Sequence, residues 1–146
     1  MAQATPQTFE NHTRLVPAYH MVAFGILVIN LLWSLYKVVR YFSVDSVMGF
    51  LLIVALLIIF LYARLFSTTV QDRVIRLEMV LRLEKLLPAD LQPRIKDFTV
   101  GQLVSLRFAS DAELPELARK VLADNITDRK SIKKMIKNWN PDYLRA

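Results

Sequence analysis

The chain has 146 residues, of which 54% are hydrophobic and 22% charged, with a net charge of +6 and a mean hydropathy of +0.33. This length allows one ordinary domain, or a pair of membrane spans with a small soluble part. The absence of cysteine from the sequence excludes disulfides, thiolate metal sites and a cysteine nucleophile.

Apolar and charged residues occupy different halves of the chain. Between residues 15 and 66 the charged residues are Lys37, Arg40, Asp45 and Arg64. After Val70 there are 15 Lys/Arg and 11 Asp/Glu, so this half carries +4 of the total +6. This division predicts that the apolar half lies in a bilayer and the charged half in water.

Residues 1–16 are polar and are expected to form an N-terminal tail. The apolar stretch that follows predicts a first transmembrane span over about residues 18–36. Lys37 and Arg40 come directly after it, without the small residues of a signal-peptide cleavage site. An uncleaved span is therefore favoured over a secretory leader.

A second apolar stretch, SVMGFLLIVALLIIFLYA, predicts another span over about residues 46–64. It contains no charge, and as a helix it would rise about 27 Å, close to the hydrocarbon thickness of a bilayer. The alternative is a pair of buried helices in a soluble protein. The remaining residues are too few to cover two helices that are hydrophobic all round. Residues 17–66 are therefore predicted to form a transmembrane hairpin.

The connection between the spans is short, so both chain ends are expected on one side of the membrane. It offers Lys37 and Arg40, whereas the side of the termini offers Arg14, Arg64, Arg73, Arg76 and Arg82. Cations near spans favour the cytoplasmic side. The count predicts a multi-pass membrane protein with both termini in the cytoplasm.

Asn30 is the notable polar residue inside the predicted spans. An amide in hydrocarbon seeks a partner, typically on a neighbouring helix, so Asn30 is expected to make an interhelical contact within the hairpin or between protomers. The spans contain no carboxylate or arginine of the kind that marks a transporter or proton path.

Residues 65–87 contain no Gly or Pro and predict that the second helix continues out of the membrane. Two acid-before-base pairs, Asp72–Arg76 and Glu78–Arg82, are spaced to meet on its surface. An apolar stripe at helical spacing is expected either to pack on the rest of the domain or to mediate self-association. Its members are Val70, Val74, Leu77 and Leu81.

Beyond Pro88 the sequence predicts a series of short helices. A turn is expected between Pro88 and Ile95, and Thr99 is expected to cap a helix that includes Leu103 and Phe108. The run Ser110–Glu113 has the form of a capping box in front of a helix with an apolar face. That face consists of Leu114, Leu117, Ala118, Val121 and Leu122.

A final helix is predicted from a cap at Thr127 to the stop at Asn140-Pro141, with Ile132, Ile136 and Trp139 facing inward. Its outward face would carry Arg129, Lys130, Lys133, Lys134 and Lys137. No segment alternates like a strand. The predicted fold is therefore all-α: a transmembrane helical hairpin whose second helix extends into a small cytosolic helical domain, residues 67–146.

Several strings in the sequence resemble a family of small uncharacterised bacterial two-span membrane proteins, catalogued as a domain of unknown function. They occur at residues 11–14, 71–78, 82–83, 106–115, 136–139 and 141–145. The resemblance implies a bacterial source and the same two-span layout. It implies no activity and supplies no site residues.

The sequence offers little for catalysis. Its histidines are His12 and His20, so the half after the spans has no imidazole base. Asp111, Glu113 and Glu116 cluster at a predicted helix start, where capping accounts for them. Three glycines in the whole chain do not make a phosphate-binding loop. We expect no enzyme, no cofactor and no metal site.

Binding therefore remains as the expected role. The first hypothesis is a membrane-anchored interaction or regulatory module that self-associates into a homo-oligomer or binds an unidentified membrane or cytosolic protein. The alternative is that the cations at 129, 130, 133, 134 and 137 contact anionic lipid. Nucleic acid is less favoured, because aromatic residues are not interleaved with these cations for base stacking.

Overall fold

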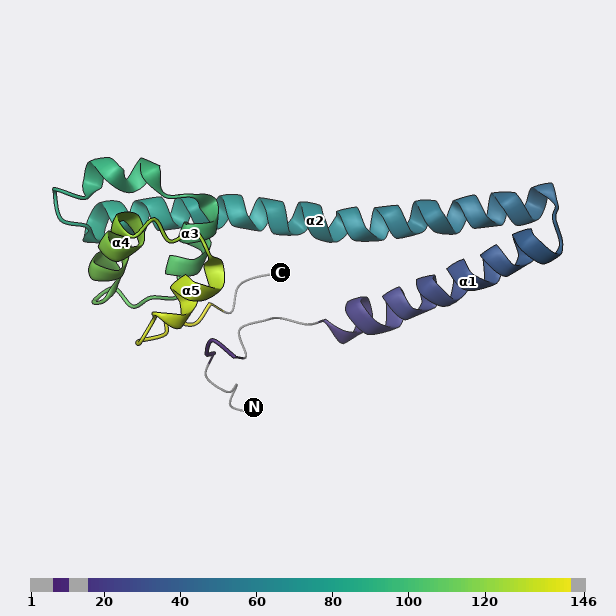
Figure 1. Ribbon diagram of the computed structural model, residues 1–146, viewed down its shortest axis with the longest axis horizontal. Helices are drawn as coiled ribbons and strands as arrows, with labels where there is room; N and C mark the ends of the chain where they lie inside the picture. Colours follow the sequence, from purple (N-terminus) through teal and green to yellow (C-terminus); the bar gives the residue numbers. More distant parts are fainter. Residues whose placement is uncertain (1–6, 11–15, 143–146) are drawn as a thin grey trace. The chain divides into compact units, whose positions relative to one another are not determined.

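The computed structural model describes residues 7–10 and 16–142 (Figure 1). These residues form helices and no strand, and the one strand-like pairing among them is an isolated bridge between Ala109 and Trp139. The predicted all-helical class is confirmed. The described residues divide into two compact units, one of residues 16–67 and the other of residues 7–10 and 68–142.

The first unit holds a short π-helix, η1 (Ala18–Ala23), continued by α1 (Phe24–Arg40), and the first part of α2 (Val44–Leu86). By length and composition, the helices at Ala18–Arg40 and Val44–Leu86 could each cross a membrane. Only 6% and 11% of the residues in their most apolar windows are buried inside the protein. Their apolar side chains therefore point almost entirely outward.

These two helices contact each other inside the first unit. The Tyr19 hydroxyl donates a hydrogen bond to the Phe60 carbonyl, and the two rings stack with their centroids 4.1 Å apart. At the other end, α2 begins where the Ser46 amide donates to Ser43 Oγ at 3.1 Å and the Ser43 amide donates to Ser46 Oγ at 2.9 Å. This reciprocal serine pair satisfies backbone donors that a helix start leaves free.

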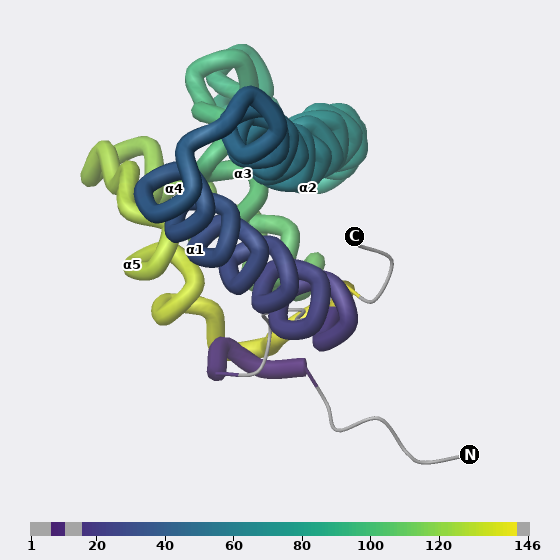
Figure 2. Tube along the Cα trace, turned by 90° about the vertical axis from the view of Figure 1, so that its right-hand side faces the viewer, coloured from purple at the N-terminus to yellow at the C-terminus, as the bar shows by residue number. Residues whose placement is uncertain are grey.

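The second unit is built on the last part of α2 and contains four short helices. These are η2 (Gln92–Asp97), a 3₁₀ helix, with α3 (Val100–Leu106), α4 (Leu114–Ala123) and α5 (Arg129–Lys134). Figure 2 looks nearly along α2 and shows α3, α4 and α5 to one side of it. The side chains buried to below 2% exposure include Leu83, Leu103, Leu106, Phe108, Leu114, Val121 and Ile132. Each contributes about 1.5–3 kcal/mol by leaving water, so this unit has its own apolar core.

The predicted continuation of the second helix is confirmed, because α2 runs unbroken to Leu86. The prediction of its inward face is incomplete. The residues that enter the core are Ile75, Met79, Leu83 and Leu87, which are at most 5% exposed. The stripe at Val70, Val74, Leu77 and Leu81 is exposed instead. Both series have helical spacing and both are apolar, so tertiary packing chose between them.

The predicted cap at Thr99 is confirmed as a capping box with Gln102. Gln102 N donates to Thr99 Oγ1 at 3.3 Å, and Thr99 N donates to Gln102 Oε1 at 2.8 Å. The box predicted at Ser110–Glu113 is wrong. The Glu113 carboxylate accepts the backbone N–H groups of Lys137 and Asn138, each at 3.2 Å. It therefore holds the C-terminal segment rather than its own helix start.

The last helix is capped by Asp128, not by Thr127 as predicted. Asp128 Oδ2 accepts Ser131 N at 2.7 Å and the Ser131 hydroxyl at 2.6 Å. Donation by the hydroxyl and then by the N–H lowers the pKa of Asp128 below its ordinary value. Upstream, α4 ends at Ala123, and Asn125, two residues later, has a φ of 47°, in the left-handed region that Asn tolerates after a helix end.

The final helix is also shorter than predicted, because α5 ends at Lys134 and does not reach Trp139. The chain beyond it pairs with the segment after α3. Asn140 N donates to the Phe108 carbonyl at 2.6 Å and Ser110 N donates to the Asn138 carbonyl at 3.1 Å. Trp139 stacks on Phe108 with centroids 4.5 Å apart. A long-range backbone pairing thus replaces the last helical turns.

The predicted acid-before-base pairs on α2 do not form. The Arg82 guanidinium donates instead to Asp111 Oδ1 at 2.7 Å, to the Arg107 carbonyl at 3.1 Å and to the Ala109 carbonyl at 2.6 Å. Asp72 lies 3.6 Å from the guanidinium of Arg129. Arg82 and Asp72 therefore pair with residues from distant elements, Asp111 and Arg129, rather than with residues one helical turn away.

Part of the N-terminal tail joins the second unit. The Gln7 side chain donates to the Asp142 carbonyl at 3.2 Å and accepts Asp142 N at 2.8 Å. The Asp142 carboxylate also lies 3.2 Å from Nε of the buried Arg107. Residues close to both ends of the chain therefore meet on the same unit.

Candidate interaction surfaces

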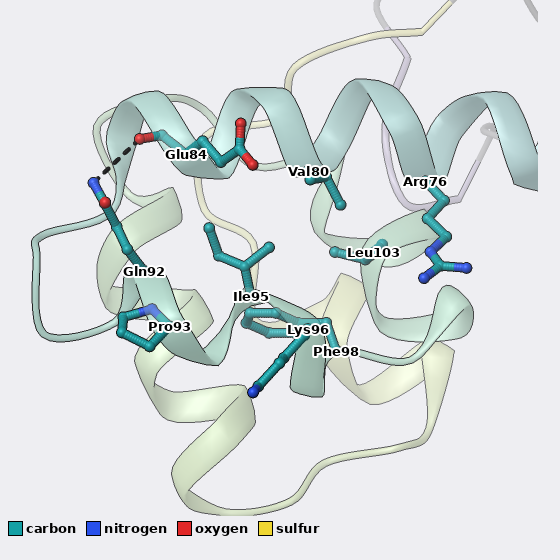
Figure 3. A pocket seen from close by; sticks show the side chains of 9 residues that line it. All are labelled: Arg76, Val80, Glu84, Gln92, Pro93, Ile95, Lys96, Phe98 and Leu103. Atoms are coloured by element: carbon teal, nitrogen blue, oxygen red, sulfur yellow. Dashed lines mark hydrogen bonds between the residues drawn. The ribbon is translucent and has the colours of Figure 1, made fainter.

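A cleft of about 570 Å³ opens in the second unit between α2, η2 and α3 (Figure 3). Its floor is apolar and consists of Val80, Ile95, Phe98 and Leu103. Its rim carries Arg76 and Glu84 from α2 and Lys96 from η2. The Gln92 amide closes one end, where it donates to the carbonyl oxygens of Glu84 at 3.3 Å and Leu87 at 3.2 Å.

The cleft has features that suit the docking of a partner. It combines an apolar floor with charges of both signs, and its lining contains no Ser, Cys or His nucleophile or base. Sequence reasoning missed it because its lining comes from three elements, and their order along the chain does not indicate which side chains meet.

Metal-ligating groups do not gather anywhere in the described ranges, 7–10 and 16–142: no three His, Cys, Asp or Glu side chains lie close enough to hold an ion. His20 Nδ1 lies 3.1 Å from the backbone nitrogen of Val16. His12 lies outside the described residues.

Of the five cations proposed to meet anionic lipid, four are exposed and one is half-buried. Arg129 is directed to Asp72, and its side chain lies against the backbone of Gly101. Lys133 is half-buried, with its ammonium 5.3 Å from the centre of the Phe108 ring. Lys130, Lys134 and Lys137 are exposed, and the Arg129 side chain remains 53% exposed beside Asp72.

Asn30 is exposed on α1, and its amide is engaged within its own helix. Its Nδ2 donates to the Ile26 carbonyl at 2.9 Å. The amide therefore makes a hydrogen bond that needs no second helix.

The third surface is the exposed apolar face of α2, which we term the outer stripe: Val70, Val74, Leu77 and Leu81. These side chains are 48–67% exposed, although they belong to the same helix as the core residues. A contiguous apolar surface of this kind marks a site of protein or membrane interaction more often than plain solvent exposure.

With these surfaces described, the chain can be compared with known proteins. Its sequence matches the profile of a family of unknown function (DUF6526) over residues 1–146. The chain belongs to this family. No curated protein and no solved structure matches it. Membership in DUF6526 confirms the family resemblance noted in the sequence. Because the function of the family is unknown, membership assigns no role to any residue of this chain.

Proposed function

We propose that this chain is an integral protein of the bacterial inner membrane, in which a transmembrane hairpin anchors a small cytoplasmic helical domain. The domain serves as an interaction module that self-associates, and the protein is not an enzyme. The observation that carries this proposal is the contrast between the two units. One exposes nearly all the apolar side chains of two long helices, and the other packs its own core.

Exposed apolar helices of this length call for a hydrocarbon solvent. Trp33 and Ile29 on α1, and Leu52 and Ile59 on α2, are each more than half exposed. In water, this surface would cost about 25 cal/mol for every Å² left exposed. A bilayer removes that cost, and the contacts between Tyr19 and Phe60 fit two spans that pack side by side.

The position of Gln7 supports the hairpin topology. Gln7 and Asp142 hydrogen bond to each other, and they flank the two apolar helices in the sequence. Two crossings return the chain to its starting side, whereas one crossing would separate these residues by a bilayer. The excess of arginine on the side of the termini then supports a cytoplasmic location.

Binding is favoured over catalysis by the surfaces of the domain. The outer stripe of α2 is apolar, and the cleft has an apolar floor at Phe98 and Leu103 beneath a charged rim, so both suit a protein partner. The alternative of anionic-lipid binding has weaker support, because Arg129 and Lys133 face groups of the protein itself. Flotation of the protein with anionic and neutral vesicles would measure any contribution of the three exposed lysines.

The topology can be tested by single-cysteine labelling, since the natural chain has no cysteine. Val44 is 78% exposed at the start of α2, and Ala123 is exposed at the end of α4. We expect Val44→Cys to react with a membrane-impermeant maleimide in intact spheroplasts. We expect Ala123→Cys to react only after permeabilisation, while both variants resist extraction from membranes by alkaline carbonate.

Two results would contradict this topology. Release of the protein by carbonate would exclude an integral membrane protein, and equal labelling at both positions in intact spheroplasts would exclude the hairpin. Labelling of Ala123→Cys alone in intact spheroplasts would keep the hairpin and reverse its orientation.

A further inference from the structure

The outer stripe lies on the face of α2 opposite to the domain core. Val70, Val74, Leu77 and Leu81 are 60%, 48%, 67% and 59% exposed. On the other side of the helix, about half a turn around its axis, Met79 and Leu83 are at most 2% exposed. Figure 2 agrees, since α3, α4 and α5 lie to one side of α2. Residues of the second unit thus cover one face of this helix and leave the other open.

The spacing of the outer stripe is that of a coiled-coil seam. Val70 and Leu77 occupy d positions, and Val74 and Leu81 occupy a positions of consecutive heptads. Val74 at a and Leu77 at d match the pattern that favours two parallel strands, whereas Leu81 at a and Val70 at d do not, so the choice of two parallel strands rests on the flanking charges.

The charges beside the stripe are complementary to those of a second copy. Arg73 takes a g position on one flank and Glu78 an e position on the other. Both are exposed, and neither has an ion-pair partner among the residues that the structure describes. In a parallel pair a g residue faces the e residue of the partner's next heptad, so Arg73 would meet Glu78 twice. An antiparallel pair would instead bring g residues to g residues and e residues to e residues.

We propose that the outer stripe is the seam of a parallel two-stranded coiled coil between two copies of this chain. The step rests on the proposed membrane anchor. Because α2 is continuous from its apolar part to Leu86, two copies in one bilayer enter the water with the same direction. The orientation imposed by the membrane is therefore the one that the charges of Arg73 and Glu78 favour.

The membrane also explains how so short a seam can hold. Four stripe residues on each helix are far fewer than the roughly 20–30 residues a side of a standard interface. Confinement to one bilayer raises the effective concentration of the second copy and removes much of the entropic cost of association. The dimer is accordingly expected in membranes and is expected to weaken when detergent dilutes the protein.

Cysteine crosslinking in native membranes tests the seam directly. Leu77→Cys places a thiol at a d position, where the two copies meet. Arg76→Cys is the matched control, because Arg76 is the adjacent exposed residue and faces the cleft. We expect a short bis-maleimide to give a dimer of the Leu77→Cys protein and little dimer of the Arg76→Cys protein. Equal dimer yields, or an adduct of Leu77→Cys with a different protein only, would overturn the proposal.

Charge exchange tests the orientation. Arg73→Glu or Glu78→Arg alone turns both inter-copy attractions into repulsions, and each is expected to lower dimer affinity roughly tenfold. The double variant Arg73→Glu/Glu78→Arg restores opposite charges and is expected to recover the dimer. Failure of the double variant to recover would overturn the parallel arrangement. Dimer yield is measured through the cysteine at position 77 in each background.

These outcomes are distinct from failure of the proposed function. If the chain is released from membranes by carbonate, the anchor is wrong, and the basis of the inference fails with it. If the chain stays in the membrane with the labelling expected at Val44 and Ala123 but Leu77→Cys gives no dimer, only the coiled-coil seam is wrong.

Discussion

Arg82 shows how one residue can join distant parts of the chain. Its guanidinium donates to Asp111 and to the carbonyl oxygens of Arg107 and Ala109, all in the turn after α3. Its sequence neighbour Glu78, one helical turn away, was the expected partner and remains exposed. A side chain that is 21% exposed gains more from three oriented acceptors than from one solvated carboxylate.

Arg82→Met should therefore destabilise the second unit strongly. The methionine keeps much of the packing of the arginine stem but leaves the three acceptors without their donor. We expect a loss of about 2–4 kcal/mol in the free energy of unfolding. The measurement is urea unfolding of the solubilised protein, monitored by the hydrogen exchange of amides in α3 and α4. Arg76→Met, an exposed position on the same helix, should change the stability by less than about 0.5 kcal/mol. Equal effects of the two substitutions would contradict the role assigned to Arg82.

At the scale of elements, α2 carries two apolar faces of similar composition. One includes Ile75 and Met79, the other Val74 and Leu77, and each repeats at helical spacing. The sequence defines the helix but provides no criterion for choosing its buried face. The same holds for α5, which was predicted to reach Trp139 by periodicity. Instead α5 ends at Lys134, because the chain around Trp139 forms backbone hydrogen bonds with the segment around Ala109.

The cap of α5 leads to a pH-dependent prediction. The Ser131 hydroxyl and N–H hold the pKa of Asp128 below its ordinary value, so the carboxylate stabilises the folded state when ionised. That contribution is fully present above the ordinary aspartate pKa of about 4 and is lost as pH falls through the lower folded-state value. Asp128→Ala should lower the melting temperature at pH 7 and have little effect at the acid end.

The control for this cap is Thr127→Ala, one residue earlier. Thr127 makes no side-chain hydrogen bond with the described residues, so its removal should leave the melting temperature unchanged at both pH values. Thermal unfolding by circular dichroism at neutral and acid pH measures both variants. A larger effect of Thr127→Ala than of Asp128→Ala would return the cap to the residue that the sequence predicted.

At the scale of the whole molecule, two features are candidates for the contact between two copies of the chain: Asn30 in the first apolar helix and the outer stripe of α2. Asn30 donates one hydrogen bond to the Ile26 carbonyl of its own helix, whereas the outer stripe has no cover from the described residues of the second unit. Asn30→Leu should therefore leave the proportion of dimer in membranes unchanged, because it removes a hydrogen bond within a helix. Leu77→Glu should abolish the dimer without unfolding the domain, since position 77 is 67% exposed.

The comparison of these two variants is made by crosslinking in native membranes through exposed lysines, with circular dichroism as the test of folding. A loss of dimer on Asn30→Leu, with Leu77→Glu unaffected, would transfer the contact between copies from the coiled coil to the spans.

The sequence by itself determined the helical class, the two apolar helices and the unbroken course of α2. These follow from the length and charge content of each segment, which no distant contact can change. Tertiary structure alone decided which face of α2 is buried, that Arg82 pairs with Asp111 and that Glu113 holds the segment at Asn138. Those choices depend on which groups meet after the chain folds. Glu78 and Asp111, for example, are both carboxylates that could pair with Arg82, and only their positions in the folded chain distinguish them.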